Sequence, residues 1–400
     1  MGAVWSGRAQ KWLISTFMAC SCLLLAGCQT VQITAPNATS SSETAAPYSM
    51  GGPSEIPNAA KGDGVADDTA ALQAWLDAGG VRLTNGKYRI TKGLILAGDN
   101  RTLQTQNATI VADGPDITAL TVTGNYARVS IHVDGQSRAA YGLKVTGSGA
   151  IIENGCYENF RSETQSARGI DASTSGGVII RNNWVRNIVS VGDKIGGNGP
   201  GASRGIGLNS TGDAQASSFI TGNTIENVSG EEGDAIHILF FDGTANPFNV
   251  GKVNISDNDI RNVSRRFIKV QASYVVVEGN KLHTDTGAIP TNPSAAIDVI
   301  RSDNVKVLDN AIDPNLVGNG IAVNGIAKAP LRGIEVRGNV LRESGANAPA
   351  GIYLKWTVSP VVRDNTVFGG SAGVQIRSST DEQVEGNAHN ESLNAAPELK

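Results

Sequence analysis

The sequence of 400 residues has few cysteines, few aromatic side chains and no excess of basic charge. Three of its four cysteines lie within the first 28 residues, which leaves Cys156 alone in the body of the chain and excludes a disulfide-stapled scaffold or a cysteine-based metal site. Its 33 Lys and Arg residues stand against 37 Asp and Glu residues. Because nucleic-acid binding requires clustered basic residues, we expect no nucleic-acid partner.

Long apolar runs are also missing, apart from one near the N-terminus. Basic residues precede the apolar stretch Trp12–Leu25, which is too short to cross a membrane comfortably. The stretch ends in the sequence LAGC at Cys28, which resembles the lipobox of bacterial lipoproteins. The resemblance implies a signal peptide of residues 1–27, acylation of Cys28 and contact with a membrane through the attached lipid. Gln29 stands where inner-membrane lipoproteins carry Asp, so the same resemblance implies export to the outer membrane.

Residues 28–55 have no apolar period and consist largely of Ser, Thr, Ala, Pro and Gly. Such a segment cannot bury enough apolar surface to offset the entropy of ordering, so we predict a disordered tether. Residues 56–395 form the predicted folded domain. The chain has 48 Gly, many Asn and many short runs of Val and Ile. Because Gly and Asn tolerate the backbone conformations of tight turns, this composition indicates a mostly β structure.

A strand-like phrase that ends in Asn recurs through the domain. Its nine terminal residues, spaced by 22 to 40 positions, are Asn154, Asn183, Asn223, Asn258, Asn280, Asn310, Asn339, Asn365 and Asn387. A second phrase alternates with the first and has the forms GLKV, GIDA, GIGL, AIHI, FIKV, AIDV, GIAV, GIYL and GVQI. Together with a short strand after each Asn, the period predicts an all-β fold, a right-handed parallel β-helix with three strands per turn. Each Asn is expected at a bend, where its amide bonds to the Asn of the next turn.

The domain opens with a segment of a different character. Asp67 and Asp68 precede the sequence TAALQAWLDAGG, residues 69–80, in which Leu72, Trp75 and Leu76 share one face. Since Asp is a good residue at a helix N-terminus, we predict a short helix here. The helix is expected to cap the N-terminal end of the solenoid, where unpaired strand edges need covering.

The run KGDGVADDTAALQ, residues 61–73, followed by VRLTNGKYRI, resembles the opening of the pectate-lyase-like and polygalacturonase-like β-helix proteins. With the repeats behind it, the likeness covers roughly residues 58–390. It implies a polysaccharide as partner, and it makes Asp63, Asp67 and Asp68 structural residues of the cap. The sequence departs from polygalacturonases, because it has no Asp-Asp pair on a body turn and no Gly-His-Gly. Arg266–Lys269 resembles their Arg-Ile-Lys signature.

The variable position of the second phrase points outward in each turn, because side chains alternate along a strand. In chain order this position holds Lys144, Asp171, Gly207, His237, Lys269, Asp298, Ala322, Tyr353 and Gln375. The bend before the phrase adds Arg168, Arg204, Asp234 and Arg266. Loops 191–204, 241–252 and 283–294 are expected to wall this face into a groove, contributing Asp193, Lys194, Asp242, Phe248 and His283. A ladder of exposed ion pairs is the alternative interpretation.

We predict catalytic and substrate-binding roles for nine residues that point outward from these turns, including Lys355, which lies two residues after Tyr353. The predicted catalytic residues are His237, Lys269, Asp298 and Asp234, and the predicted substrate-binding residues are Arg204, Arg266, Asp171, Tyr353 and Lys355. A lyase would use Lys269 or His237 to remove the proton beside a uronic carboxylate, with cations to stabilise the developing charge. A hydrolase would need two carboxyl groups, either Asp234 with Asp298 or Asp171 with Asp234.

Several functions stay open on this basis. Cleavage of an acidic polysaccharide is favoured, with a lyase slightly ahead of a glycoside hydrolase because Arg, Lys and His are abundant on the face. A non-catalytic polysaccharide-binding or export lipoprotein and a polysaccharide epimerase are the alternatives. Acidic outward residues alone do not define an oxygen cage, so we assign no metal ligand and keep Ca²⁺ as the one cofactor to test. The sequence makes no prediction of the oligomeric state.

Overall fold

The computed structural model describes residues 59–174, 176–192, 199–285, 294–313, 318–343 and 350–392. Within these ranges it contains one helix and 34 strands. The predicted signal peptide, the lipidation residue Cys28 and the tether of residues 28–55 lie outside the described residues, as do Asp193 and Lys194. No helix within the described ranges combines the length and the apolar character needed to cross a membrane.

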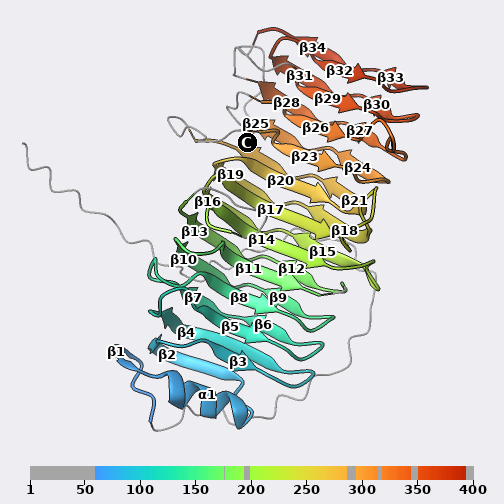
Figure 1. Ribbon diagram of the computed structural model, residues 1–400. Coiled ribbons are helices and arrows are strands. Elements are labelled where there is room, and N and C mark those ends of the chain that lie inside the picture. Colours follow the sequence, from blue (N-terminus) through green and yellow to red (C-terminus); the bar gives the residue numbers. More distant parts are fainter. Residues whose placement is uncertain are drawn as a thin grey trace, which may run out of the picture. The chain divides into compact units, whose positions relative to one another are not determined.

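Each turn of the domain contributes three short strands, and equivalent strands of successive turns pair in parallel (Figure 1). One complete turn consists of β11 (Ala167–Ser173), β12 (Ile179–Arg181) and β13 (Trp184–Ser190). The first strand of each turn belongs to an eleven-stranded sheet, named sheet B here, and the other two belong to a 23-stranded sheet, named sheet A. The predicted parallel β-helix with three strands per turn is therefore confirmed.

Sheet B contains β3 (Leu94–Leu96), β5 (Thr118–Val122), β8 (Tyr141–Val145), β11, β14 (Ala202–Ser210), β17 (Glu232–Phe240), β20 (Arg266–Gln271), β23 (Ile297–Ile300), β26 (Ile321–Asn324), β29 (Ile352–Lys355) and β32 (Val374–Arg377). Sheet A begins with β1 (Asp63–Asp67), β2 (Arg82–Ile90) and β4 (Thr102–Ala112). It then divides into two rows. The first row holds β6 (Arg128–Ser130), β9 (Ile151–Glu153), β12, β15 (Ser218–Thr221), β18 (Val250–Ser256), β21 (Ser273–Glu278), β24 (Val305–Leu308), β27 (Glu335–Arg337), β30 (Val361–Arg363) and β33 (Gln383–Glu385). The second row holds β7 (His132–Asp134), β10 (Cys156–Ser162), β13, β16 (Thr224–Ser229), β19 (Asp259–Val263), β22 (Lys281–His283), β25 (Ala311–Asp313), β28 (Val340–Glu343), β31 (Thr366–Gly369) and β34 (Ala388–Asn390).

The core consists of aliphatic side chains that stack from turn to turn. In sheet B the stack includes Ile170, Ile206, Ile236, Ile268 and Ile297, which are paired in register and have 0% exposure. Parallel strands lie about 4.8 Å apart, so each isoleucine packs directly on the next. Because side chains alternate along a strand, this inward stack fixes which residues of sheet B face outward.

An asparagine ladder runs along one bend of the solenoid. Its members are Asn183, Asn223, Asn258, Asn280, Asn310, Asn339, Asn365 and Asn387, and each Nδ2 donates to the Oδ1 of the next at 2.9–3.0 Å. The backbone N–H of each also donates to that same oxygen. The predicted ladder is confirmed for these eight residues.

Asn154, predicted as the first member of the ladder, lies outside it. The ladder position in that turn belongs to Gly155, whose N–H donates to Asn183 Oδ1 at 3.0 Å. Asn154 instead occupies the preceding position, which has a left-handed backbone in each turn, with φ of 51° at Asn154 and 64° at Gly222. Asn tolerates this conformation better than most residues, so the same residue type serves two adjacent positions of the bend.

The helix α1 (Thr69–Asp77) precedes the first complete turns and buries Leu72, Trp75 and Leu76, as predicted. Asp68 does not cap the helix with its side chain. Its carboxylate accepts the N–H groups of Lys61 at 2.7 Å and Gly62 at 3.1 Å, and so fixes the strand that enters the fold. These contacts give the acidic opening motif a structural role.

Candidate functional site

Three columns of outward side chains run along sheet B, one residue per turn. The first column contains Arg168, Arg204, Asp234 and Arg266. The second contains Lys144, Asp171, Gly207, His237, Lys269, Asp298, Ala322, Tyr353 and Gln375. The third contains Ser173, Asn209, Leu239, Gln271, Ile300, Asn324, Lys355 and Arg377. The predicted register therefore holds, and His237, Lys269 and Asp298 occupy equivalent positions of three consecutive turns.

Eight charged residues of β11, β14, β17, β20 and β23 form what we name the charged cluster. They are Arg168, Asp171, Arg204, Glu232, Asp234, Arg266, Lys269 and Asp298. None is more than 8% exposed. Four cations thus balance four carboxylates in a buried setting, and the alternative of an exposed ion-pair ladder does not describe this part of sheet B.

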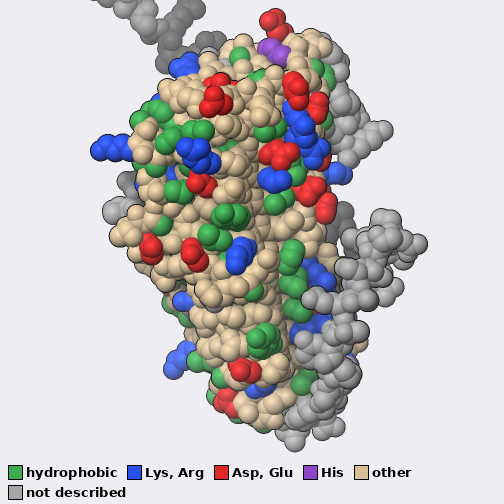
Figure 2. Space-filling view, turned by 90° about the vertical axis from the view of Figure 1, so that its right-hand side faces the viewer, with side chains coloured by type: hydrophobic (Ala, Val, Ile, Leu, Met, Phe, Trp, Pro, Cys, Tyr) green, Lys and Arg blue, Asp and Glu red, His purple; other side chains and the backbone are tan. Residues whose placement is uncertain are grey.

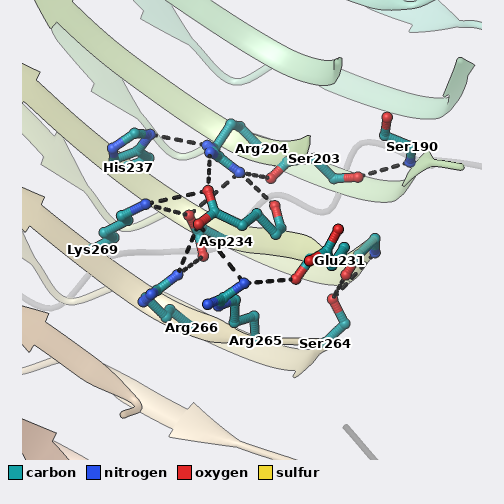
Figure 3. A network of polar contacts seen from close by, with 12 residues as sticks. Ser190, Ser203, Arg204, Glu231, Asp234, His237, Ser264, Arg265, Arg266 and Lys269 are labelled. Carbon is teal, nitrogen blue, oxygen red and sulfur yellow. Dashed lines mark hydrogen bonds and ion pairs between the residues drawn. The ribbon is translucent and has the colours of Figure 1, made fainter. Parts of the chain in front are cut away.

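Asp234 lies at the centre of the charged cluster with 0% exposure (Figure 3). Its carboxylate faces Arg204 Nη1 at 3.3 Å, Arg266 Nη1 at 3.4 Å and Lys269 Nζ at 3.7 Å. Burial by itself would raise the pKa of Asp234, but the three surrounding cations outweigh it and hold the pKa below its usual value. Asp234 is therefore ionised and is unsuited to donate a proton.

Lys269 does not contact Asp298, although the two residues are paired in register. Its Nζ lies 3.3 Å from Glu232 Oε2 and 3.7 Å from Asp234 Oδ2, whereas Asp298 accepts a bond of 2.7 Å from Arg266 Nε. Burial lowers the pKa of Lys269, and the neighbouring arginines lower it further against the pull of the two carboxylates. The alignment of Lys269 and Asp298 in one column therefore does not produce an ion pair between them, because Arg266 occupies Asp298 and Glu232 pairs with Lys269.

His237 is neutral and has a defined tautomer. Arg204 Nε donates to His237 Nδ1 at 2.9 Å, so this nitrogen carries the lone pair. Burial and then the nearby Arg204 and Lys269 lower the pKa of His237 well below 6.5. The ring proton therefore lies on Nε2, which donates to Gln271 Oε1 at 2.9 Å. Both ring nitrogens already have protein partners.

Glu232 is the member of the charged cluster that sequence reasoning missed. It pairs with Arg204 at 3.2 Å and with Lys269 at 3.3 Å. The signal was available, because Glu232 stands two residues before Asp234 and alternation along a strand places both on the same face. Glu232 lies at the start of β17, five residues before the variable position of the repeat at His237.

Tyr353 and Lys355 lie on sheet B but away from the charged cluster. They belong to β29, two strands beyond Asp298 on β23, with Ala322 and Asn324 of β26 between them. Lys355 Nζ lies 3.9 Å from the ring centroid of Trp356 and pairs in register with Arg377. The structure therefore divides the predicted site residues into a buried cluster and a separate cationic end of the third column.

Three residues predicted to wall this face lie in the described part of the loops and do not join the charged cluster. His283 belongs to β22 in sheet A, where its Nε2 lies 3.0 Å from Asp259 Oδ1. Phe248 is buried against Phe241 and lies beneath the guanidinium of Arg301. Asp242 binds the backbone of its own loop, which lowers its pKa to about 2.

Calcium does not fit the charged cluster, because each carboxylate there already faces arginine or lysine and Ca²⁺ needs six to eight oxygen ligands. Within the described ranges, metal-ligating side chains converge at His132, Cys156 and Glu158 of sheet A. Cys156 is disulfide-bonded, so its sulfur is not available as a thiolate ligand, and Glu158 is already paired with His132 at 2.8 Å and Arg186 at 2.6 Å. We therefore derive no step through a metal.

Acidic and basic side chains are interspersed on the face of the molecule that Figure 2 shows. The residues described on this face form no extended basic patch.

The chain matches a family model described as the right handed beta helix region over residues 237–394. No curated protein matches it. The surface adhesin PfbA of Streptococcus pneumoniae is 15% identical over 83% of this chain and 88% of its own, with a TM-score of 0.55. The N-terminal fragment of gene product 12 of bacteriophage Phi29 is 14% identical over 84% and 70%, with a TM-score of 0.51. The Dettilon tailspike protein is 13% identical over 82% and 66%, also with a TM-score of 0.51. The likeness extends to the fold, and the protein is a right-handed parallel β-helix protein.

Proposed function

We propose that this protein acts on an acidic polysaccharide that lies along sheet B. The observation that carries this proposal is the third outward column, whose described members are half-exposed or exposed and end in Lys355 and Arg377. These two cations are paired in register, and neither forms an ion pair with a carboxylate among the described residues. Like charges in this position repel, and an anionic ligand would relieve the repulsion.

Cleavage by a lyase is the activity that the charged cluster supports best. Its base must sit near cations that stabilise the enolate formed when a proton leaves the carbon beside a carboxylate. Lys269, with a lowered pKa and Arg204 and Arg266 nearby, has these surroundings. A hydrolase requires one carboxyl that keeps its proton, and Asp234 is held ionised.

Binding without turnover is the second candidate. It is favoured by the contacts that these side chains already make within the protein. The ammonium of Lys269 in the charged cluster and both ring nitrogens of the adjoining His237 have protein partners. Such a cluster would hold sheet B rigid under a bound polymer. An epimerase would share the proton abstraction of the lyase and leave the chain length unchanged.

One screen separates these functions. The protein is incubated with acidic and neutral polysaccharides, and absorbance of unsaturated sugars is recorded together with reducing ends. Unsaturated products support the lyase, whereas reducing ends without unsaturation support a hydrolase. Binding with unchanged polymer length and unchanged sugar composition by NMR supports a binding protein, and a changed composition supports an epimerase. Absence of both binding and turnover across the panel overturns the proposal.

The lipobox at Cys28 supports a further part of the proposal, namely that the protein is exported and anchored by lipid to the outer membrane. An anchor of this kind would hold the polysaccharide-active domain at the membrane surface through the tether of residues 28–55.

A further inference from the structure

Three amide side chains recur in the third outward column. Asn209 on β14, Gln271 on β20 and Asn324 on β26 are half-buried and lie beside the second column. Apolar residues, Leu239 on β17 and Ile300 on β23, occupy the turns between them. The column thus alternates between amide and apolar side chains over five consecutive strands of sheet B.

In each of these side chains, one polar atom of the amide group is hydrogen-bonded to the second-column residue of the preceding turn. The three bonds are Asn209 Nδ2 to Asp171 Oδ1 (3.1 Å), His237 Nε2 to Gln271 Oε1 (2.9 Å) and Asn324 Nδ2 to Asp298 Oδ1 (3.4 Å). The second polar atom of each amide group is Oδ1 in the two asparagines and Nε2 in the glutamine. These atoms have no protein partner in the part of the chain that the structure describes. The buried residues therefore fix the amides in orientation and leave one polar atom of each for a ligand.

The spacing of the amides indicates a repeating ligand. Successive strands lie about 4.8 Å apart, so amides on every second strand recur at about 9.6 Å along the solenoid axis. This distance is close to the length of two sugar residues in an extended polysaccharide. Leu239 and Ile300 between the amides offer apolar surface to the C–H faces of sugar rings, and the amide halves match hydroxyl groups.

We propose that the third column is a repeating subsite for a linear acidic polysaccharide that runs along the solenoid axis. Asn209, Gln271 and Asn324 bind hydroxyl groups of alternate sugar residues, and Lys355 and Arg377 bind carboxylates further along the same chain. The inference rests on the proposed function and specifies the direction and spacing of the bound polymer. According to this proposal, the polysaccharide is recognised by the amide side chains, which lie outside the charged cluster.

The first test uses the full-length protein and measures binding to alginate, polygalacturonate and hyaluronan by affinity electrophoresis. Asn209→Ala, Gln271→Ala and Asn324→Ala should each weaken the binding by about 2- to 10-fold, the effect of one lost hydrogen bond. The triple variant should lose binding multiplicatively. Asn254→Ala is the matched control, because Asn254 is a half-buried outward asparagine of β18 in sheet A.

Gln271→Glu tests the same contact in a variant that is expected to remain folded. It keeps an oxygen for His237 Nε2 and replaces the outward donor by a second oxygen, so it should weaken binding of acidic polysaccharides with little change in thermal midpoint. A second measurement uses size-defined oligosaccharides. Affinity should rise with length up to about seven sugar residues, which span the six turn intervals from β14, which carries Asn209, to β32, which carries Arg377.

The outcomes separate this inference from the proposed function. If a polysaccharide binds the wild type and the folded triple variant equally well, the subsite is wrong and the proposed function stands. If affinity stops rising at two sugar residues, the repeating subsite is also wrong. If none of the three polymers binds the wild type, the subsite falls, and the wider screen decides whether the proposed function falls with it.

Discussion

Asn280→Ala tests the asparagine ladder at one of its interior members. Asn280 has 0% exposure, and its Oδ1 accepts the N–H of Asn258 at 3.1 Å and the Nδ2 of Asn258 at 2.9 Å. Its own Nδ2 donates to Ile255 O at 2.9 Å, to Glu278 O at 3.1 Å and to Asn310 Oδ1 at 2.9 Å. The substitution removes all five bonds without placing a new group in the bend.

The lost bonds do not all carry the same cost. Asn258 Nδ2 keeps Ile220 O as a partner, and Asn310 Oδ1 keeps the N–H of Asn280. The backbone N–H of Asn258 loses the acceptor that the structure gives it, and a buried donor without a partner costs about 1–3 kcal/mol. We therefore expect the free energy of unfolding to fall by about that amount.

Guanidinium unfolding, followed by circular dichroism, measures this loss. Asn254→Ala provides the comparison, because it removes the same side chain from the neighbouring strand β18 outside the ladder. Equal midpoints for the two variants would refute the energetic importance of the ladder. In a solenoid each turn contacts only its neighbours, so a broader transition for Asn280→Ala would localise the damage to two adjacent turns.

Three further predictions concern other residues. Lys269→Ala should lower turnover of a cleavable polysaccharide about 100-fold. It should also destabilise the fold by about 3 kcal/mol, since it leaves buried carboxylates short of a cation. Lys144→Ala, in the same column outside the charged cluster, should have neither effect, and full activity of a folded Lys269→Ala variant would show that another residue is the base. The pKa of His237 is lowered on folding, so its contribution to stability is present above pH 6.5 and lost as the pH falls below that value. Between pH 7 and 5.5 the wild type should lose about 1 kcal/mol that His237→Gln does not lose, as measured by unfolding at both pH values. Cys28→Ser should abolish labelling by a radioactive fatty acid and release the protein from membranes, and unchanged partitioning would exclude the lipid anchor.

The repeat made most of the fold predictable from sequence. Alternation along each strand separates inward Ile236 from outward His237, and the period between phrases then aligns His237 with Lys269 and Asp298. Backbone register follows from such patterns because a slip of one residue would turn the apolar face outward. The column positions could therefore be derived without coordinates.

The contacts between side chains were less predictable. Lys269 pairs with Glu232 rather than with Asp298, which is bonded to Arg266. These pairings depend on which long side chains lie within reach of each carboxylate. Burial of the charged cluster was also missed, because exposure depends on what surrounds sheet B as well as on which way a residue points. Asn154 was misplaced by one position because the bend uses asparagine both for its amide and for its tolerance of positive φ.

The eight-membered asparagine ladder separates the stability of the solenoid from the length of its turns. Ladder neighbours are as little as 22 and as many as 40 residues apart, yet their amide bonds keep the same length of 2.9–3.0 Å. Extra residues are therefore accommodated in the loops, and the strands on either side of a loop keep the same register. A natural variant could gain or lose a long surface segment between two strands without disturbing the bends, and the protein could acquire a new binding specificity while its framework stays unchanged.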